Sequence, residues 1–455
     1  MTSKKHLAEK IPLAGGISLL PGKVVKNSPR TFVPDAIYSL GQDAFCVELK
    51  SLAYKVFIFT KLHRLEEIAQ LQFLSVLPLN GHAIRGLYPH TFGHNRLIHS
   101  FRVAAVSLVM GKTLELSYGE MGKLLVSGLL HDAFTCAGGD SWKDINHQGT
   151  LFDEDNDFAK KIFRYFGDGW RTLSTHYDGF DPESAALEIA DVVSGKGLLG
   201  GIQEIADTAS YMLGDLEEIR KSTRRHKNQQ DFARILLAAE RPWDVWNHVS
   251  VCEGKVVVTD SVTLNNFLML RVLLWADFYQ NPRVKYLEML LQKIVYPHLV
   301  DKHLIKIHEL PLKNDKYLRG VIGRQMGWAD VQIQHLDVLG AFPKLEAFAD
   351  WDEALVFEEE KYRAGAATLI YDARQFPSIK SKVEKYHVIG ENGSSQTSAL
   401  AFAHAYPTRA EAIEEIARLA MAPDKPVQVA WVENPKISDN YRRAWEAARL
   451  RWHKK

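Results

Sequence analysis

A long series of apolar residues at helical spacing, from about residue 52 to residue 310, constrains the fold of this chain more than any other feature. In the segment Arg64–Leu77 apolar residues recur every three positions, from Leu65 to Leu77, which predicts an apolar stripe along a helix. Similar segments follow at His94–Met110, Gly119–Leu130, Phe158–Phe166, Glu183–Val193, Gly201–Ile219, Leu264–Tyr279 and Arg283–Val295. Amphipathic helices bury their apolar faces against one another, so the pattern predicts a mainly α-helical core.

The pattern changes on either side of this core. Residues 1–50 mix short segments with Gly and Pro, which predicts an N-terminal arm or short strands. After residue 340 we expect strands at Tyr386–Ile389, Ala399–Ala403 and Val427–Val432, and a helix at Thr408–Met421. A hairpin is expected inside the helical region, from Val249–Cys252 and Lys255–Thr259. The expected parts are therefore the arm (1–50), a helical domain (51–340) and a small C-terminal α+β module (341–455).

Composition limits the classes of protein that fit. The chain has 455 residues, is 46% hydrophobic, and carries 56 Lys and Arg against 55 Asp and Glu. This balance argues against a protein that coats nucleic acid, although a local basic cluster could still meet a small anion. The cysteines Cys46, Cys136 and Cys252 form no CxxC pair, which argues against a disulfide framework or a cysteine-rich zinc site. No apolar stretch of roughly 18 residues and no convincing signal peptide is present, so we expect a cytoplasmic protein without membrane contact.

Histidines and aspartates inside the apolar helices are the residues that point to chemistry. His99 lies in the helical segment 94–110, and the doublet His131-Asp132 closes the apolar run Leu124–Leu130. A carboxylate at the end of a buried helix is costly to desolvate unless a charged partner meets it. A divalent cation is one such partner, and a mixed imidazole and carboxylate set suits zinc, iron or manganese. The plain alternative is a core histidine that is hydrogen-bonded to an aspartate.

A metal site needs further ligands, and two aspartates are candidates because they lie in identical short motifs. Asp191 and Asp207 each end the word Glu-Ile-Ala-Asp. Only Asp207 is followed by Tyr211 and Asp215 at i+4 and i+8, which places all three on one face of a helix. A polar stripe on an otherwise apolar helix either faces solvent or lines a pocket, and the residues alone leave both interpretations open.

The order of these residues resembles a known family. His99, then His131-Asp132, then Asp207 is similar to the H…HD…D order of the HD-domain metal-dependent phosphohydrolases. The likeness is closest to the deoxynucleoside triphosphate triphosphohydrolase branch and extends from about residue 50 to about residue 300. Three further motifs of that branch have matches here. The first is Arg64-Leu65-x-x-Ile68-x-Gln70-Leu71, and the second is Tyr88-Pro89 followed by His94-x-Arg96-x-x-His99-Ser100. The third is the spacing of Asp207, Tyr211 and Asp215.

The resemblance implies an HD-domain helical core with a role for each matching residue. One divalent metal ion (zinc, manganese, iron or magnesium) would be bound by His99, His131, Asp132 and Asp207. Arg96 would hold phosphate, a task that suits a planar guanidinium. Gln70 and Asp215 stand where the family reads the sugar hydroxyl, and Tyr211 stands where the family packs against the sugar. The ion would activate water or neutralise charge on the attacked phosphorus.

The segment after the doublet departs from the family pattern. Thr135 stands where the family has its catalytic histidine, and a threonine hydroxyl cannot act as a general acid near neutral pH. His147 falls near a later family histidine and is the first choice for protonating the leaving oxygen, with Asp140 as the second. Thr208 and Gly214 stand where the family carries basic residues, which favours a monophosphate or another phosphoester over a triphosphate.

Together these observations predict a metal-dependent phosphohydrolase that acts on a nucleotide, most simply a (deoxy)nucleoside phosphate, through attack of metal-bound water on phosphorus. Two alternatives stay open. One is a phosphomonoesterase that uses the same site. The other is a catalytically weak HD scaffold that binds nucleotide as a sensor or regulator, an option that Thr135 keeps open. A homo-oligomer is also compatible with the sequence.

Overall fold

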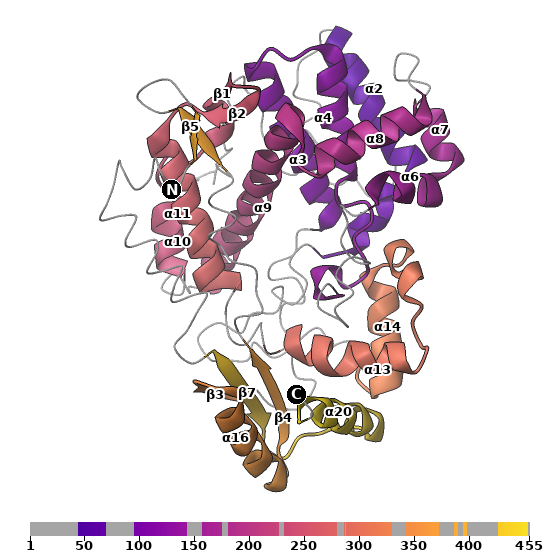
Figure 1. The fold of residues 1–455 in the computed structure, drawn as a ribbon, viewed down its shortest axis with the longest axis vertical. Helices are drawn as coiled ribbons and strands as arrows, with labels where there is room; N and C mark the ends of the chain where they lie inside the picture. Colours follow the sequence, from indigo (N-terminus) through magenta and orange to yellow (C-terminus); the bar gives the residue numbers. More distant parts are fainter. Residues whose placement is uncertain are drawn as a thin grey trace, which may run out of the picture.

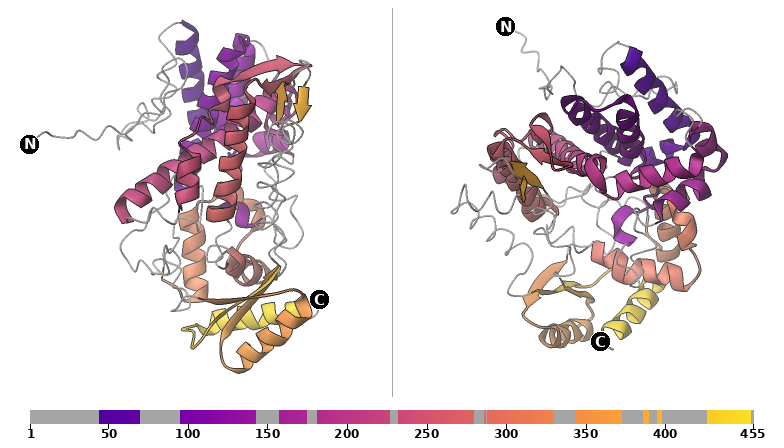
Figure 2. Two further views of the ribbon diagram at one scale, coloured as in Figure 1. Left: turned by 90° about the vertical axis from the view of Figure 1, so that its left-hand side faces the viewer. Right: turned by 45° about the horizontal axis from the view of Figure 1, so that its top comes forward.

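The computed structural model describes residues 44–69, 95–142, 157–174, 181–226, 232–279, 286, 288–329, 343–372, 386–389, 395–397 and 426–453. Within these residues the chain is mainly α-helical with two small sheets, as the apolar pattern predicts. Figure 1 and Figure 2 show long helices packed together at one end of the molecule and a small sheet with two helices at the other. The two ends are built around separate hydrophobic cores.

Three helices form the centre of the first core: α3 (Arg96–Thr113), α4 (Tyr118–Leu130) and α9 (Gly197–His226). Helix α3 packs against both α4 and α9 and is buried along nearly its whole length. Helices α3 and α4 approach closely, because a Cβ atom at Gly128 would lie 2.7 Å from the backbone of Ala104. These helices carry the histidines and aspartates that the sequence singles out.

Shorter helices surround this centre, and α8 packs against both α4 and α9. They are α2 (Ala44–Phe59), α6 (Phe158–Phe166), α7 (Asp168–Ser174), α8 (Pro182–Val193), α10 (Ala233–Ala238) and α11 (Ser261–Leu273). Short 3-10 helices lie at η2 (Leu62–Glu67), η5 (Gly139–Trp142) and η8 (Val245–Asn247).

Helix caps fix where α3 and α4 begin and end. Asn95 caps α3, and its side chain accepts the backbone N–H of Ile98 at 2.9 Å. Ser117 and Glu120 form a capping box at the start of α4. Helix α4 ends at Leu130 with His131 as its C-cap, so the His131 imidazole and the carboxylate of the next residue lie at a helix terminus.

The helix expected over Arg64–Leu77 is wrong in its first part. The 3-10 helix η2 stands there, and Ile68, which follows it, has an extended backbone. A 3-10 helix has three residues per turn, so Leu62 and Leu65 share one face, and both are buried with Ile68. Ala69 then pairs with Asn95 in an isolated antiparallel bridge. Residues 70–77 lie outside the described residues.

Two segments that the sequence predicts as α-helix contain π-helical turns. Helix α11 passes into a π-helical turn at Leu274–Tyr279. A second π-helical turn, η10 (Leu291–Val295), leads into α13 (Tyr296–Asp301). The i→i+5 bonding of such turns gives no apolar periodicity that differs clearly from that of an α-helix, so the sequence pattern does not reveal them.

The first sheet joins distant parts of the chain. The expected hairpin is present as β1 (Val249–Cys252) and β2 (Lys255–Val258). Strand β5 (His387–Ile389) pairs in parallel with β2, and β6 (Ser395–Thr397) pairs with β5, in the order β1-β2-β5-β6. The strand expected at residues 386–389 is therefore present, but it pairs with the hairpin at the helical end and with β6, and not with the strands of the second sheet.

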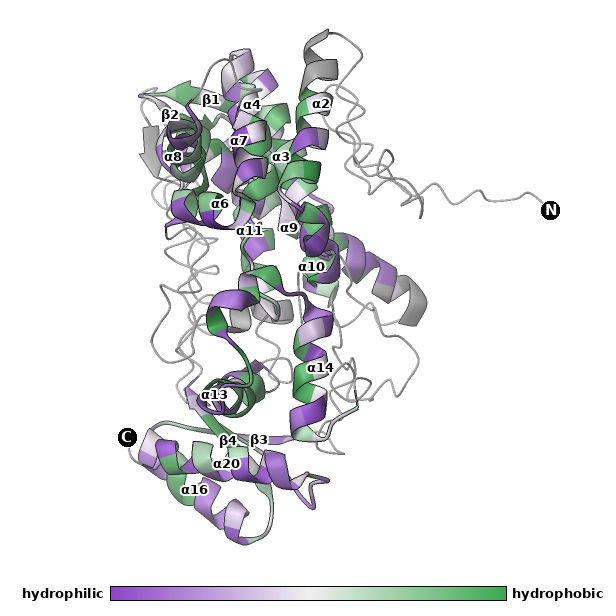
Figure 3. Cartoon of the chain, turned by 90° about the vertical axis from the view of Figure 1, so that its right-hand side faces the viewer, coloured by the Kyte–Doolittle hydropathy of each residue, from purple (hydrophilic) through white to green (hydrophobic). Residues whose placement is uncertain are grey.

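The second core lies against an antiparallel sheet in the order β3-β7-β4, made of β3 (Lys344–Phe348), β7 (Val427–Val432) and β4 (Ala367–Asp372). Helix α16 (Trp351–Arg363) packs on this sheet, and α20 (Asp439–Trp452) packs on α14 (Asp315–Met326). Both α16 and α20 carry hydrophilic and hydrophobic residues, whereas α3 is largely hydrophobic (Figure 3). The 3-10 helix η11 (Ile307–Leu312) and α13 complete this core.

Several sequence expectations fall outside the described residues. They concern most of the N-terminal arm, the strand Ala399–Ala403 and the helix Thr408–Met421. The domain boundaries at 50 and 340 stay a prediction. Within the described part of the chain, no helix combines the length and the hydropathy needed to cross a membrane.

Candidate metal centre

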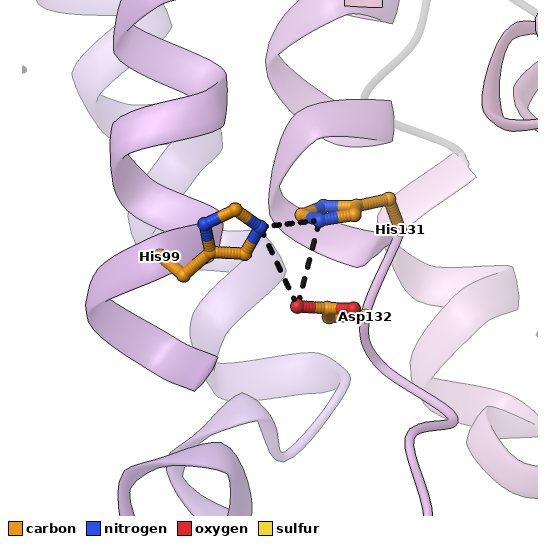
Figure 4. A group of neighbouring side chains, drawn as sticks. All are labelled: His99, His131 and Asp132. Carbon is orange, nitrogen blue, oxygen red and sulfur yellow. Dashed lines mark hydrogen bonds and ion pairs between the residues drawn. The ribbon is translucent and has the colours of Figure 1, made fainter. Parts of the chain in front are cut away.

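Three side chains from two helices meet at the junction of α3 and α4. His99 projects from α3, and His131 and Asp132 project from the end of α4 (Figure 4). The Nε2 atoms of the two imidazoles are 3.2 Å apart. Asp132 Oδ2 lies 3.7 Å from His99 Nε2 and 3.5 Å from His131 Nε2. His99 is 1% exposed and Asp132 is 2% exposed, so the group lies where uncompensated charge is costly.

Asp207 of α9 lies beside this group, against the two histidines. Its Oδ1 atom lies 2.8 Å from His99 Nε2 and 3.6 Å from His131 Nε2, and its side chain is 42% exposed. Asp191, the rival aspartate, lies on α8 and forms an exposed ion pair with Lys196 at 2.7 Å. The structure therefore brings together the four residues expected as ligands and leaves Asp191 outside the group.

Hydrogen bonds orient these side chains. His131 Nδ1 lies 2.8 Å from the carbonyl oxygen of Gly128, so Nδ1 donates and Nε2 is the nitrogen turned toward the group. Arg96 Nη1 donates to Asp132 Oδ1 at 2.8 Å, and Thr135 Oγ1 donates to the same oxygen at 3.3 Å. Among the described residues, Asp132 Oδ2 accepts no hydrogen bond although it is buried. The carboxylate thus turns its unsatisfied oxygen toward the imidazoles.

The spacing of the ligand atoms of His99, His131 and Asp132 fits a single divalent ion, because all three lie within 4.8 Å of one another, and Asp207 adjoins them through the histidines. Two ligands held by one ion at roughly 2.0–2.2 Å, at right or tetrahedral angles, lie roughly 2.9–3.5 Å apart. The imidazole nitrogens are 3.2 Å apart, and the oxygen–nitrogen distances run from 2.8 to 3.7 Å. Two Nε2 atoms at this separation can share only one proton. A cation would satisfy both nitrogens and the buried oxygen at once, and this donor set suits zinc, iron or manganese.

The charges of the group reinforce one another. Burial opposes ionisation of Asp132, but Arg96 and the two histidines outweigh it and lower the pKa of the carboxyl to about 2. Burial also opposes a charged His131, but Asp132 and Asp207 outweigh it and raise the pKa of the imidazole to about 9. The group therefore keeps Asp132 ionised and attracts positive charge to the place where a cation would replace a proton.

Tyr211 and Asp215 follow Asp207 along α9. Asp215 is fully buried and accepts a hydrogen bond from the hydroxyl of Tyr279. Burial raises the pKa of its carboxyl to about 7, although that hydrogen bond acts in the opposite direction. The rings of Tyr211 and Tyr279 lie edge to face with centroids 6.4 Å apart. The Asp215 carboxyl and the Tyr211 ring thus follow Asp207 along α9, and Tyr279, from the π-helical turn after α11, contacts both of them.

Other expected site residues are only partly placed. Gln70 and His147 lie outside the described residues. The backbone of Asp140 belongs to η5, while its side chain lies outside the described part of the chain. The sugar contact of Gln70 and the proton donation by His147 or Asp140 therefore stay predictions.

The structure adds a buried arginine that the sequence reasoning missed. Arg271 of α11 donates from Nη1 to the hydroxyl of Tyr386 at 2.8 Å, and that hydroxyl donates to Thr208 Oγ1 at 2.8 Å. The guanidinium carbon also lies 5.9 Å from the centroid of the Tyr211 ring. The available signal was a single arginine inside the apolar run Phe267–Leu274, because a charge in such a run needs a buried partner.

Comparison with known proteins shows a shared fold. No protein-family model and no curated protein matches the chain. A phosphohydrolase of Bacteroides thetaiotaomicron is 13% identical, with a TM-score of 0.54 over 84% of this chain and 95% of that chain. A hypothetical protein of Aquifex aeolicus is 17% identical, with a TM-score of 0.50 over 88% of this chain and 95% of that chain. At such identities the likeness concerns the fold, which this helical chain shares with a protein named a phosphohydrolase.

Proposed function

We propose that this chain is an HD-type, metal-dependent phosphohydrolase that acts on a nucleotide, most simply a (deoxy)nucleoside phosphate. The observation that carries the proposal is the meeting of two imidazole nitrogens and two carboxylate oxygens from His99, His131, Asp132 and Asp207. A fold shared with a phosphohydrolase agrees with it. A divalent ion held there would act as a Lewis acid and lower the pKa of water.

Two arginines near the ligand group would orient the ligands and bind the phosphate of the substrate. Arg96 keeps Asp132 ionised and directs its second oxygen inward. The phosphate-binding role that the sequence predicts for Arg96 stays part of the proposal. Arg271 interacts electrostatically with Asp207, so in this proposal it supplies a second positive charge near the ligand group.

The nucleotide part of the proposal rests on α9. Asp215, with a pKa of about 7, exists as both acid and carboxylate near neutral pH and can therefore donate to or accept from a sugar hydroxyl. The Tyr211 ring provides apolar surface against which a sugar could pack. Gln70 completes the sugar contacts in this proposal, as the resemblance implies.

Protonation of the leaving oxygen is assigned to His147 first and to Asp140 second. Thr135 occupies the family position of the catalytic histidine, and its hydroxyl is hydrogen-bonded to Asp132 Oδ1. This contact favours a second candidate function, in which the same site binds nucleotide and metal with weak or no turnover, as a sensor or regulator.

Metal analysis followed by a hydrolysis screen tests the proposal. The protein is loaded with Zn²⁺, Mn²⁺, Fe²⁺ or Mg²⁺ and incubated with nucleoside mono-, di- and triphosphates. Inorganic phosphate from monophosphates would identify a phosphomonoesterase, and tripolyphosphate would identify a triphosphohydrolase. Nucleotide binding without product would support the sensor. A protein that binds neither metal nor nucleotide would contradict both functions.

The variants Asp132→Asn and Asp191→Asn form a matched pair for this screen. Each replaces an aspartate by its isosteric amide, but Asp132 lies within the ligand group and Asp191 on the surface. We expect Asp132→Asn to lose bound metal and turnover, and Asp191→Asn to keep both. An equal loss in the two variants would contradict the ligand assignment.

A further inference from the structure

The loop that follows Asp132 leaves the first core and enters the second. Cys136, Ala137 and Trp142 are buried among the residues of the second core. The Trp142 ring stacks on Tyr296 with centroids 4.0 Å apart, and its Nε1 atom donates to the carbonyl oxygen of Ala137 at 2.7 Å. Contacts in the second core therefore bear on a segment that begins at a candidate metal ligand.

Asp315, in the first turn of α14, binds this loop through its buried carboxylate. The residue is 8% exposed. Its Oδ1 atom accepts the backbone N–H of Gly138 at 2.8 Å, and its Oδ2 atom accepts the backbone N–H of Ala69 at 2.9 Å. One carboxylate thus joins two segments that are far apart in the sequence.

The first of these segments leads into the helix that carries His99. Ala69 pairs with Asn95, the N-cap residue of α3, and the N–H of Arg96 donates to the carbonyl oxygen of Ile68 at 2.9 Å. A change in the position of Ala69 would therefore move the start of α3.

The second segment is the loop itself, which is closely packed at Gly138. This residue has a φ of +84°, and a Cβ atom there would lie 2.6 Å from the Leu318 side chain. The backbone can approach α14 this closely only because the position is glycine. Its amide therefore has a fixed place, with the Asp315 carboxylate as its acceptor.

A cation binds the same loop next to α14. Arg64 Nη2 donates to the carbonyl oxygen of Ala133 at 2.8 Å, and Nη1 donates to the carbonyl oxygens of Thr135 at 3.0 Å and Lys313 at 2.8 Å. The guanidinium and the Asp315 carboxylate thus both connect this loop to the start of α14.

We propose that Asp315 is a positioning residue for the candidate metal centre: its carboxylate fixes the start of α3 and the loop after Asp132 relative to each other, and so sets the spacing of the ligand atoms. The inference rests on the proposed function for the identity of the ligands. A carboxylate is needed because both of its oxygens accept. In Asp315→Asn the amide nitrogen would face one of the two donors and leave a buried N–H unsatisfied.

Amide hydrogen exchange in the metal-free protein is the first test, with Glu358→Gln as the control variant. Glu358 is also a fully buried carboxylate of the second core, but its partners are Arg449, Thr368 and His453. Both variants should lower the melting temperature. Only Asp315→Asn should speed exchange of the Ala69 and Gly138 amides beyond this general loss, by about tenfold.

Zn²⁺ affinity, measured by competition with a chelator under folding conditions, is the second test. Asp315→Asn should bind Zn²⁺ about 10–100-fold more weakly, the usual effect of removing an outer-shell partner. Glu358→Gln should stay close to the wild type because its site is independent. Coupling is reciprocal, so Zn²⁺ should also slow exchange at Ala69 and Gly138 in the wild type.

Unchanged exchange at both amides in Asp315→Asn would overturn the inference, as would equal weakening of Zn²⁺ binding in Glu358→Gln. If Asp315→Asn does not fold, the wild type decides: Zn²⁺ that protects α3 but leaves Ala69 and Gly138 unchanged is the contrary result. A wild type that binds no metal contradicts the proposed function instead, and metal-free exchange still tests the role of Asp315.

Discussion

Each hydrophobic core contains a buried cluster of carboxylate and imidazole groups, and the two clusters differ in how their charges are met. In the first, Asp132 Oδ2 accepts no hydrogen bond within the described part of the chain and faces His99 and His131. In the second, Glu358 accepts two hydrogen bonds from Arg449, at 2.7 and 3.1 Å, and His453 Nε2 lies 3.0 Å from its Oε2.

Residue types alone do not separate these clusters, because each offers three candidate ligand atoms within 4.8 Å of one another. The two clusters differ in how many carboxylate oxygens the neighbouring arginine binds. Arg449 binds both oxygens of Glu358 and closes an ion-pair network, whereas Arg96 is bonded to one oxygen of Asp132. A cation would displace an existing partner in the second cluster, and in the first it would supply a missing one.

The largest effect on stability should come from opening the closed cluster. Glu358→Ala leaves the Arg449 guanidinium largely buried without its main partner, which typically costs about 3–5 kcal/mol of unfolding free energy. Urea denaturation measures this loss, and Zn²⁺ binding by the folded protein should not change. Glu359→Ala is the control, because Glu359 is partly exposed and its removal should cost less than about 1 kcal/mol. Equal losses in the two variants would show that the network is not closed.

A third buried carboxylate, Asp215, should make the unfolding free energy depend on pH. Its pKa rises from about 3.9 in the unfolded chain to about 7 in the fold, mainly because of burial. The folded state then binds the proton more tightly, so the contribution of Asp215 to stability is present below about pH 4 and is lost as pH rises to about 7. Asp215→Asn should remove this loss, on the order of 2–4 kcal/mol at neutral pH.

Denaturation of the metal-free wild type and Asp215→Asn at several pH values between 4 and 8 measures this difference. Parallel stability curves for the two proteins across that range would contradict the raised pKa.

The smallest expected effect concerns Arg96, which donates to one oxygen of Asp132 in the first cluster. Arg96→Ala removes the cation that keeps Asp132 ionised, so Zn²⁺ affinity should fall about 10–100-fold, as is usual for an outer-shell partner. If Arg96 holds phosphate as well, substrate binding and rate should fall by about 1.5–3 kcal/mol at saturating Zn²⁺. Zn²⁺ titration beside steady-state kinetics separates the two roles. Unchanged values in both measurements would leave Arg96 with a purely structural role.

Helix positions could be predicted from the sequence because their signals are local. The segment Phe158–Phe166 is a helix with those bounds, and the helix expected at Glu183–Val193 begins one residue earlier, at Pro182, after the cap Asp181. Caps and apolar spacing act within a few residues and are therefore visible in a single sequence. The prediction of an α-helix from Arg64 was wrong where η2 stands, because an apolar spacing of three suits a 3-10 helix as well as an α-helix.

Parts of the candidate site depend on contacts that leave no local pattern. The sequence favours Asp207 over Asp191 through the Tyr211 and Asp215 that follow it, but its contact with the histidines arises from the packing of α9 against α3. The strand at residues 386–389 was expected, but a parallel partner far away in the sequence could not be read from it. Asp315 and Arg271 are single charged residues whose partners are backbone amides or distant hydroxyls, so no spacing marks them.

The position of β5 has a consequence for how this molecule could change over evolutionary time. The strands on either side of the β5–β6 pair in the sequence, β4 and β7, belong to the second core, while β5 lies between β2 and β6 in the first sheet. Tyr386, next to β5, links Arg271 to Thr208 beside the candidate ligand Asp207. An evolutionary exchange of the C-terminal third for an unrelated unit would therefore also remove the Tyr386 hydroxyl that connects Arg271 to Thr208, and so would change the surroundings of the candidate metal centre.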